Sequence, residues 1–283
     1  MYNFLVRFQN LDRRWIFVGM ALSILIPMLF PVSFPFRVDQ RVQDLYDTVD
    51  ELPDGSKIFL SADFDPASRP ELEPFFRANL HHLFRKDIQI VSATLWPSAP
   101  PLVLPIMKEI AEKHGKVYGE DWVFLGFKDG KELAIKSIGE NIPKAFPKDF
   151  EGTDITTLPI MSGVRQAKDF PLIVSVSAGF PGTQEYVLQI QGQYSLDIVS
   201  SCTAVSGPDY IPFFKAGQLR GLSAGIPGSA HYEQLVFPDG PPEGTRLLGI
   251  AGYNVLSLGH LFIVLLIIAG NIAYFLTTPR EEA

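Results

Sequence analysis

Small and polar residues follow four apolar runs of the chain that have the length and composition of buried strands. They are Asp63 and Asp65, the group Trp96–Ser98, the group Gly179, Gly182 and Thr183, and Thr203 with Ser206. In open parallel sheets, ligands bind in the crevice beyond the carboxyl ends of the strands. The spacing therefore predicts that these residues line the ligand-binding edge, if the protein binds a ligand there.

Of the four groups, the Gly179–Thr183 segment most strongly suggests a ligand-binding site. Small residues that lead directly into a helix expose backbone N–H groups, which can hold phosphate or another anion. The segment is neither a GxGxxG motif nor a Walker loop, and it lacks the lysine of a Walker loop. Its glycines are equally explained by a turn between strand and helix. An anion site and a plain turn both stay open.

Asp63 and Asp65 flank one aromatic residue after a predicted strand, and their oxygens suit Mg²⁺ or Mn²⁺. A single D-x-D is common, however, and Asp65 with the following proline equally suits a turn or a helix cap. His81 and His82 are adjacent on a predicted helix, so they point about 100° apart and do not easily face one ion. We predict no metal site and no cofactor.

The sequence shows no catalytic set. No Ser/His/Asp or Cys/His combination has supporting context. The single cysteine, Cys202, excludes an internal disulfide framework and is typical of a small buried residue in a strand. The formal net charge of −7 and the pI near 5.3 argue against nucleic-acid binding, which usually needs a basic face. The residues therefore favour a protein that is not an enzyme.

The elements that would position these residues alternate between strand and helix. Apolar runs at 57–64, 88–96, 122–127, 170–177 and 196–204 are typical of strands, and 70–86, 101–115, 182–194 and 208–225 are typical of helices. This alternation predicts α/β architecture: an open, mostly parallel, Rossmann-like sheet of about five strands. The stretch 128–168 departs from it, with a short helix at 132–138 inside an ordered excursion.

Three glycines recur every four residues within the last predicted helix, at Gly217, Gly221 and Gly225. On one helix face they would form a flat strip where another backbone approaches closely. Glycine costs about 1 kcal/mol relative to alanine inside a helix, so three at this spacing indicate a packing role. Close packing within the chain, contact with another subunit and contact with a ligand all stay open.

Two long apolar runs flank the domain. The run 15–34 has no charge over about 20 positions, the length that a helix needs to cross a hydrocarbon core of about 30 Å. A cleaved signal peptide would show a shorter apolar stretch and a small-residue cleavage site. The run 247–277 has Tyr253 and Tyr274 near its ends, where aromatic rings favour the membrane interface. Both runs are predicted to be transmembrane helices.

These predictions divide the chain into successive segments. They are a tail (1–14), a first span (15–34), a stalk (35–56), the α/β domain (57–237), a linker (238–246), a second span (247–277) and a C-terminal tail (278–283). The stalk has a helical apolar stripe formed by Val42, Leu45, Val49 and Leu52. Basic residues are slightly more frequent at the termini, so the positive-inside rule predicts cytoplasmic termini and an extracytoplasmic domain.

Polar and small residues inside the second span share a face. His260 and Asn271 are separated by close to three helical turns, and Gly259 and Gly270 have the same spacing. Polar groups within a span usually face protein rather than lipid, which predicts a helix-packing face. The alternative is that both polar side chains reach the headgroups at opposite ends of the span.

A further pattern lies in segments 119–142, 146–153 and 202–235. It comprises an aspartate-aromatic-valine strand, a glycine-rich turn and a glycine-rich helix that ends in Tyr-Glu. The matching positions, in chain order, are Asp121, Trp122, Val123, Gly126, Gly217, Gly221, Tyr232 and Glu233. In these features the chain resembles an uncharacterised family of bacterial two-span membrane proteins. It departs from the family at Ile226-Pro227, which interrupt the helix. The resemblance implies this architecture and a bacterial membrane origin, without an assigned activity.

We expect a non-enzymatic accessory or scaffold subunit of a complex in the bacterial cytoplasmic (inner) membrane. The two anchors, the small-residue strips and the missing catalytic set motivate this expectation. The partners would be the lipid bilayer and other membrane protein subunits or a second copy of the chain, and not nucleic acid. Two alternatives stay open: a ligand-binding or sensory domain, and a membrane-anchored enzyme with a phosphate-type ligand at Gly179–Thr183.

Overall fold

The computed structural model describes residues 11–30, 34–241 and 244–277. The chain divides into two compact units, one formed by residues 37–250 and the other by the two ends of the chain. The first is an α/β unit that contains all the strands named below. The second contains the two apolar segments.

The α/β unit is built on an open sheet of six parallel strands in the order β3-β2-β1-β4-β5-β6. The strands are β1 (Lys57–Asp63), β2 (Gln89–Thr94), β3 (Trp122–Phe127), β4 (Leu172–Ser177), β5 (Asp197–Cys202) and β6 (Gly221–Ala224). The order reverses between β1 and β4, as in doubly wound folds. The predicted Rossmann-like α/β class is confirmed, but the count of five strands was one too few.

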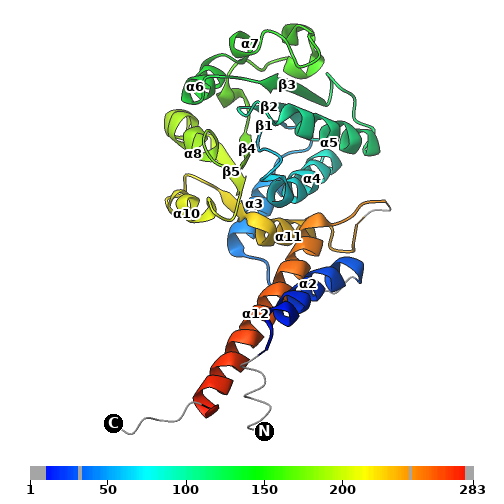
Figure 1. Ribbon diagram of the computed structural model, residues 1–283. Helices are drawn as coiled ribbons and strands as arrows, with labels where there is room; N and C mark the ends of the chain where they lie inside the picture. Colours follow the sequence, from blue (N-terminus) through cyan, green and yellow to red (C-terminus); the bar gives the residue numbers. More distant parts are fainter. Residues whose placement is uncertain (1–10, 31–33, 242–243, 278–283) are drawn as a thin grey trace. The chain divides into compact units, whose positions relative to one another are not determined.

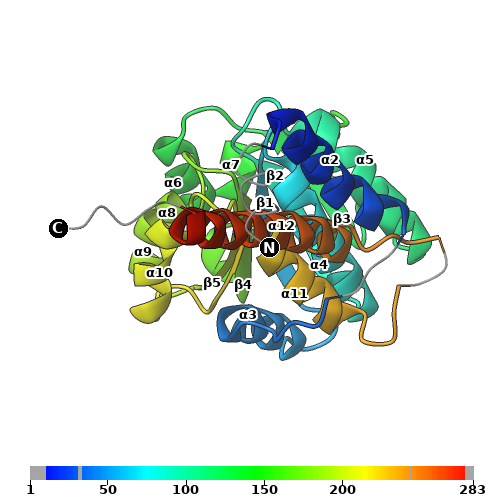
Figure 2. The same ribbon diagram turned by 60° about the horizontal axis from the view of Figure 1, so that its bottom comes forward.

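Helices cover both faces of the sheet, and each face has its own apolar core. One face is covered by α3 (Gln40–Asp50), α4 (Arg69–Arg85), α5 (Pro100–Lys113) and α11 (Gly225–Val236). The other is covered by α6 (Glu132–Glu140), α7 (Ile142–Ala145), α8 (Thr183–Tyr186), the π-helical turn η4 (Val187–Gln191), α9 (Gly192–Tyr194) and α10 (Gly207–Lys215). Figures 1 and 2 show these two groups on opposite sides of the sheet.

The excursion between β3 and β4 is ordered, as predicted. It contains α6, α7 and three short 3-10 turns, η1 (Ile155–Thr157), η2 (Pro159–Met161) and η3 (Ala167–Asp169). Its apolar side chains belong to the same core as the second group of helices. The predicted short helix at 132–138 therefore lies inside α6.

The strand that was not predicted, β6, lies within the segment 208–225, which was predicted to be one helix. The helix α10 ends at Lys215, and Gly217 adopts a φ of +73°, which a right-handed helix does not allow. The chain then pairs with β5 as β6, with Leu222 beside Ser200. Gly221 lies against the backbone of Leu45 so closely that a side chain at this position would overlap it. The prediction failed because a four-residue edge strand has too short a pattern to separate from a helix.

The predicted stalk is a helix, but it is packed as part of the α/β unit. In α3 the side chains of Val42, Leu45 and Val49 are buried in the core on the α4 face of the sheet. The helix contacts β6 and α11. Its apolar stripe was correctly predicted, whereas its packing depended on β6, which the sequence did not reveal.

The second unit contains α2 (Arg13–Leu29) and most of α12 (Leu248–Thr277). Among the described residues, only α12 is long and apolar enough to cross a membrane, with 30 residues and a mean hydropathy of 2.3. The first span predicted over 15–34 is not supported, because α2 has 17 residues and Phe30 is already extended. Phe30 precedes Pro31, and a residue before proline is sterically disfavoured in a helix. Residues 31–33 lie outside the described part.

Candidate functional site

Asp63 lies at the carboxyl end of β1 and is completely buried. Its Oδ1 accepts hydrogen bonds from the Leu95 amide at 2.6 Å and the Thr94 hydroxyl at 3.3 Å, and its Oδ2 accepts one from the Ser61 hydroxyl at 2.5 Å. Burial raises the pKa of Asp63 to about 7, although the hydrogen bonds oppose this shift. The carboxyl group therefore joins β1 to the end of β2 and uses its oxygens within the fold.

Asp65 forms the turn that leads toward α4. Its Oδ1 accepts hydrogen bonds from the Ser68 amide at 2.9 Å and the Ser68 hydroxyl at 2.6 Å, and these bonds lower its pKa. The turn interpretation thus describes Asp65. In the described part of the chain, no group of three or more His, Cys, Asp or Glu side chains is arranged to hold a metal ion.

The Gly179–Thr183 segment is a tight turn in which several polar groups have partners within the chain. The Gly182 amide donates to Glu185 Oε2 at 2.7 Å. The Thr183 hydroxyl is buried between the hydroxyls of Ser175 and Ser200, at 2.9 Å and 2.8 Å. A side chain added at Gly182 would overlap Ser177. The glycine is therefore explained by a close approach, and the amide predicted to hold an anion faces a carboxylate.

A hydrogen bond crosses the carboxyl edge at the point where the strand order reverses. The Trp96 indole N–H, after β2, donates to the Pro181 carbonyl, after β4, at 2.9 Å. The two residues thus meet across the end of β1. Doubly wound folds usually bind their ligands at this point. Here a hydrogen bond within the chain crosses it.

Thr203 and Ser206 lie in the loop between β5 and α10. Their hydroxyls are 3.1 Å apart, and the Ser206 hydroxyl donates to the Ala178 carbonyl at 3.4 Å. The loop is thereby joined to the end of β4. Of the predicted edge residues, Gly179 and Ser206 line one hollow, whereas the others serve the fold.

The hollow at this edge, which we call the carboxyl-edge hollow, has a volume of about 340 Å³. It is lined by Glu132, Gly179, Phe180, Gln184, Glu185, Ser206, Asp209 and Tyr210. Three of these side chains are carboxylates and two are aromatic. Burial raises the pKa of Glu185. The ammonium group of Lys131 lies 5.3 Å from the centre of the Phe180 ring, in a cation–π contact. The three carboxylates disfavour an anion, and the aromatic rings suit a cation such as that of Lys131.

Four large apolar side chains are exposed on this hollow or within three residues of its lining in the sequence. They are Leu133 (73% exposed), Phe180 (55%), Leu188 (54%) and Val205 (85%). Leu133 follows Glu132, and Val205 precedes Ser206, so both border residues of the lining. Exposed apolar residues that gather at one place with a polar surround often mark a protein contact.

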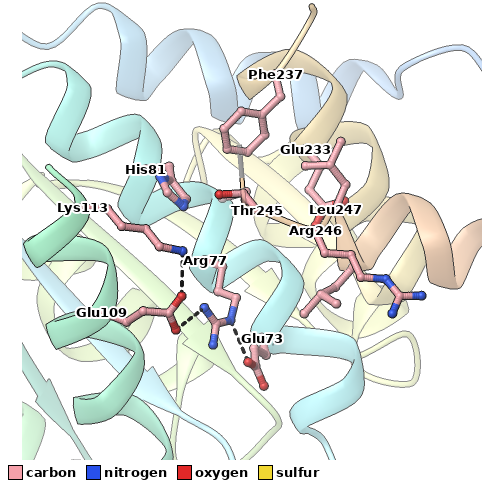
Figure 3. A pocket seen from close by; sticks show the side chains of 13 residues that line it. Glu73, Arg77, His81, Glu109, Lys113, Glu233, Phe237, Thr245, Arg246 and Leu247 are labelled. Atoms are coloured by element: carbon pink, nitrogen blue, oxygen red, sulfur yellow. Dashed lines mark hydrogen bonds and ion pairs between the residues drawn. The ribbon is translucent and has the colours of Figure 1, made fainter. Parts of the chain in front are cut away.

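A second hollow, which we call the anchor-side hollow, has a volume of about 250 Å³ and lies between α4, α5, α11 and the residues that lead into α12 (Figure 3). One wall is a row of ion pairs. Arg77 is 2.7 Å from Glu73 and 2.9 Å from Glu109, and Lys113 is 2.8 Å from Glu109. Although burial opposes it, the hydrogen bonds from Arg69 and Arg77 hold the pKa of Glu73 below its usual value.

The Tyr232-Glu233 pair connects helices that are far apart in the sequence. The Tyr232 hydroxyl is 2.9 Å from both Asn79 Nδ2 and His82 Nδ1, and His82 Nε2 is 3.1 Å from Asp50. These bonds join α11 to α4 and α3. The pair lies inside α11, so the expected glycine-rich helix that ends in Tyr-Glu is replaced by a strand and a new helix.

Glu233 caps the first turn of α12 from a distance in the sequence. Its buried carboxylate accepts hydrogen bonds from the amides of Gly249 at 2.9 Å and Ile250 at 2.8 Å. Burial raises its pKa to about 7, although these amides oppose the shift. This role of Glu233 was not predicted from the sequence. The sequence did contain one indication. Leu247 precedes the first residue of α12, where a helix usually has a capping side chain, and an apolar residue there implies that the cap comes from elsewhere.

The structure separates the predicted glycine strip. Gly217 lies in a turn, Gly221 in β6, and Gly225 begins α11 with a φ of +61° against Ala204. They therefore share no helix face, which corrects the prediction. The physical reason is that Gly217 and Gly225 adopt left-handed conformations that interrupt a helix.

The predicted packing face of the second span has no contact in the described part of the chain. A side chain added at Gly259 or Gly270 would meet no described atom. His260 and Asn271 are exposed, and His260 Nδ1 lies 2.8 Å from the Leu256 carbonyl one turn earlier. A packing role for this face stays a prediction.

The fold and its hollows define an α/β protein with a six-stranded parallel sheet and, among the described residues, one helix that could cross a membrane. Comparisons with known proteins do not extend this class. No family model, no curated protein and no solved structure matches the chain.

Proposed function

We propose that this protein is a membrane-anchored, non-enzymatic accessory or scaffold subunit of a bacterial membrane complex. The observation that supports this proposal most directly is at the carboxyl edge of the sheet. There the bond from Trp96 to Pro181 crosses the usual ligand crevice, whereas Leu133, Phe180, Leu188 and Val205 are exposed. A surface of this kind suits contact with a partner protein.

The chemistry of the carboxyl-edge hollow argues against the phosphate-type ligand considered for this edge. Glu132, Glu185 and Asp209 contribute carboxylates to the lining, and like charges repel a phosphate. The Gly182 amide, which would have bound the phosphate, donates to Glu185. A partner that presents a basic side chain among apolar ones would match this surface in charge and polarity.

Anchoring to a membrane supports the same proposal. The helix α12 has the length and hydropathy of a membrane span. Its first turn is capped by Glu233 of the α/β unit. A domain on the same chain as such a helix is suited to hold a partner at a membrane surface.

The test is the native mass of the complex, extracted in mild detergent with a tag on the C-terminus. We expect the wild-type protein in a defined assembly with other membrane proteins. The change Val205→Asp places a charge on the exposed rim and should release the partner. The control is Val117→Asp, because Val117 is also exposed (51%) but precedes β3, away from the carboxyl edge. A lone monomer, a simple homodimer or equal assembly of both variants would contradict the proposal.

A ligand-binding domain is the second candidate, favoured by the aromatic residues and carboxylates of the same hollow. Such a lining suits an organic cation. Thermal unfolding of the full chain with a panel of amines distinguishes the two functions. Stabilisation that disappears in Glu185→Gln, with no assembly in the wild type, would favour the ligand-binding function.

A further inference from the structure

We propose that the anchor-side hollow binds the phosphate-bearing headgroup of a membrane lipid. The hollow is lined by residues that lead directly into the apolar helix, from Gly244 to Leu248. Leu248 is the first residue of α12. The proposal rests on the membrane anchoring in the proposed function, and it adds a ligand that this function does not require.

The length of α12 places the hollow near the depth of lipid headgroups. Tyr253 and Tyr274 are 21 residues apart, which corresponds to about 32 Å along a helix and matches a hydrocarbon core of about 30 Å. Aromatic rings at both boundaries are typical of a span. Leu248 precedes Tyr253 by five residues, or about 7.5 Å, and thus falls within the headgroup layer.

The lining offers hydrogen-bond donors and positive charge to a phosphate. Arg77, Lys113 and Arg246 balance the three acidic side chains of the lining, Glu73, Glu109 and Glu233, in a chain whose formal net charge is −7. The carboxylate of Glu233 is already turned to the amides of α12. The lining is therefore more positive than the protein as a whole.

Donors remain on the cations after the ion pairs are formed. A guanidinium has five N–H donors, and the bonds from Arg77 to Glu73 and Glu109 use two of them. An ammonium has three, and the bond from Lys113 to Glu109 uses one. The row can thus accept a phosphate without losing its internal pairs. Figure 3 shows Arg246 on the opposite side of the hollow, extended away from this row.

Apolar side chains complete the hollow. Phe237, Leu247 and Leu248 lie in the same lining as the ion-pair row. A phospholipid combines a charged phosphate with an apolar glyceride, and both parts find a counterpart here. The phosphate group is the shared chemistry of a lipid headgroup and of free phosphate, so the experiment must separate these two sources.

The test is native mass spectrometry of the full chain in mild detergent. The probes are phosphatidylglycerol and a diacylglycerol with the same acyl chains, which lacks the phosphate. We expect retention of phosphatidylglycerol over diacylglycerol in the wild type. Retention should fall about five-fold for each charge removed, so about 25-fold in Lys113→Gln with Arg246→Gln. The matched control is Lys108→Gln, on the same helix α5, where Lys108 pairs with Glu151 outside the hollow.

The possible outcomes distinguish the headgroup site from the membrane anchoring on which it rests. Equal retention of the two probes, or equal retention by the double variant and the Lys108→Gln control, would overturn the proposal. Inorganic phosphate that binds the wild type alone as tightly as phosphatidylglycerol would overturn the lipid source. A chain missing from the membrane fraction would overturn the anchoring itself. A membrane-embedded chain without selective lipid retention would instead overturn the headgroup site and leave the proposed function standing.

Discussion

Glu233 joins the α/β unit to the start of α12 with one buried carboxylate. The first amides of a helix lack partners within the helix, and a side chain near the start usually satisfies them. Asp39 does so for α3 and Asn141 for α7. For α12 the acceptor comes from α11, and Gly249 is necessary because a side chain there would overlap the backbone of Ser229 and Ala230.

The change Glu233→Ala should lower the free energy of unfolding by about 1–2 kcal/mol, because the amides of Gly249 and Ile250 lose their acceptor. Hydrogen exchange at these two amides should become faster. The control is Glu120→Ala, since Glu120 is exposed. Unchanged exchange at both amides would show that Glu233 does not cap the helix.

At the scale of elements, the edge of the sheet depends on a close contact between β6 and α3. Gly221 has no side chain, and this lets the backbone of Leu45 approach β6 directly. The apolar stripe of α3 is then buried in the core. A helix that the sequence placed outside the domain thus covers its last strand.

The change Gly221→Val should separate α3 from β6 and destabilise the protein by about 3 kcal/mol through overpacking. The control Gly217→Ala meets no neighbour and should cost about 1 kcal/mol, because the φ of +73° is unfavourable for alanine. Chemical denaturation measures both values. A smaller effect at Gly221 than at Gly217 would refute the close contact.

The helices α3, α4 and α11 also meet at a buried histidine. His82 is 2% exposed and lies between Asp50 and the Tyr232 hydroxyl. Burial lowers the pKa of His82 to about 4, although the contact with Asp50 opposes this shift. The side chain is therefore neutral at pH 7 and would acquire a charge inside the core at low pH.

This histidine should make the fold sensitive to acid. The folded pKa of about 4 is below the ordinary value of 6.5, so the unfolded state binds more protons between these two pH values. His82 should thus remove up to roughly 3 kcal/mol of stability as the pH falls through this window. The measurement is the stability difference between wild type and His82→Gln across this range, in which other titrating groups cancel. Parallel curves would contradict the assignment.

At the scale of the whole molecule, the two apolar segments differ. The helix α12 has 30 residues, whereas α2 has 17 and ends at Leu29. Within the unit that they form, Gly19 of α2 lies against the ring of Phe262 of α12. The structure thus supports one candidate span among the described residues, and the second span stays a prediction.

Single arginines near the two helix centres distinguish these segments. An arginine at the centre of a span costs about 2.5–3.5 kcal/mol in insertion. We expect Leu265→Arg, in α12, to reduce retention in the membrane fraction after alkaline extraction. Leu22→Arg, in α2, should leave retention unchanged if α12 alone anchors the chain. Equal loss in both variants would restore the two-span prediction.

Much of the fold could be predicted because its signals are local. The apolar runs that became β1 to β5 and the helical stripes of α3, α4 and α5 depend on residues a few positions apart. The turn at Asp65 and the burial of Cys202 could also be predicted from neighbouring residues. In each case neighbouring residues determine the side-chain period and the turn conformation.

The candidate site could be predicted only in part. The sequence located the carboxyl edge and its residues, since strand ends follow from strand positions. It could not show that Trp96 bonds to Pro181 or that the Gly182 amide faces Glu185, because these bonds depend on how separate loops meet. The exposure of Phe180 and Val205 is likewise a property of the packed surface.

By itself, the sequence determined an open parallel α/β domain and an apolar C-terminal helix, because period and hydropathy are carried by neighbouring residues. Only the tertiary structure decided that 221–224 is a strand, that α3 covers it, and that Glu233 caps α12. The reason is physical. Each of these features needs a partner distant in the chain, and a hydrogen bond or a close packing contact forms only where the fold brings both partners within reach.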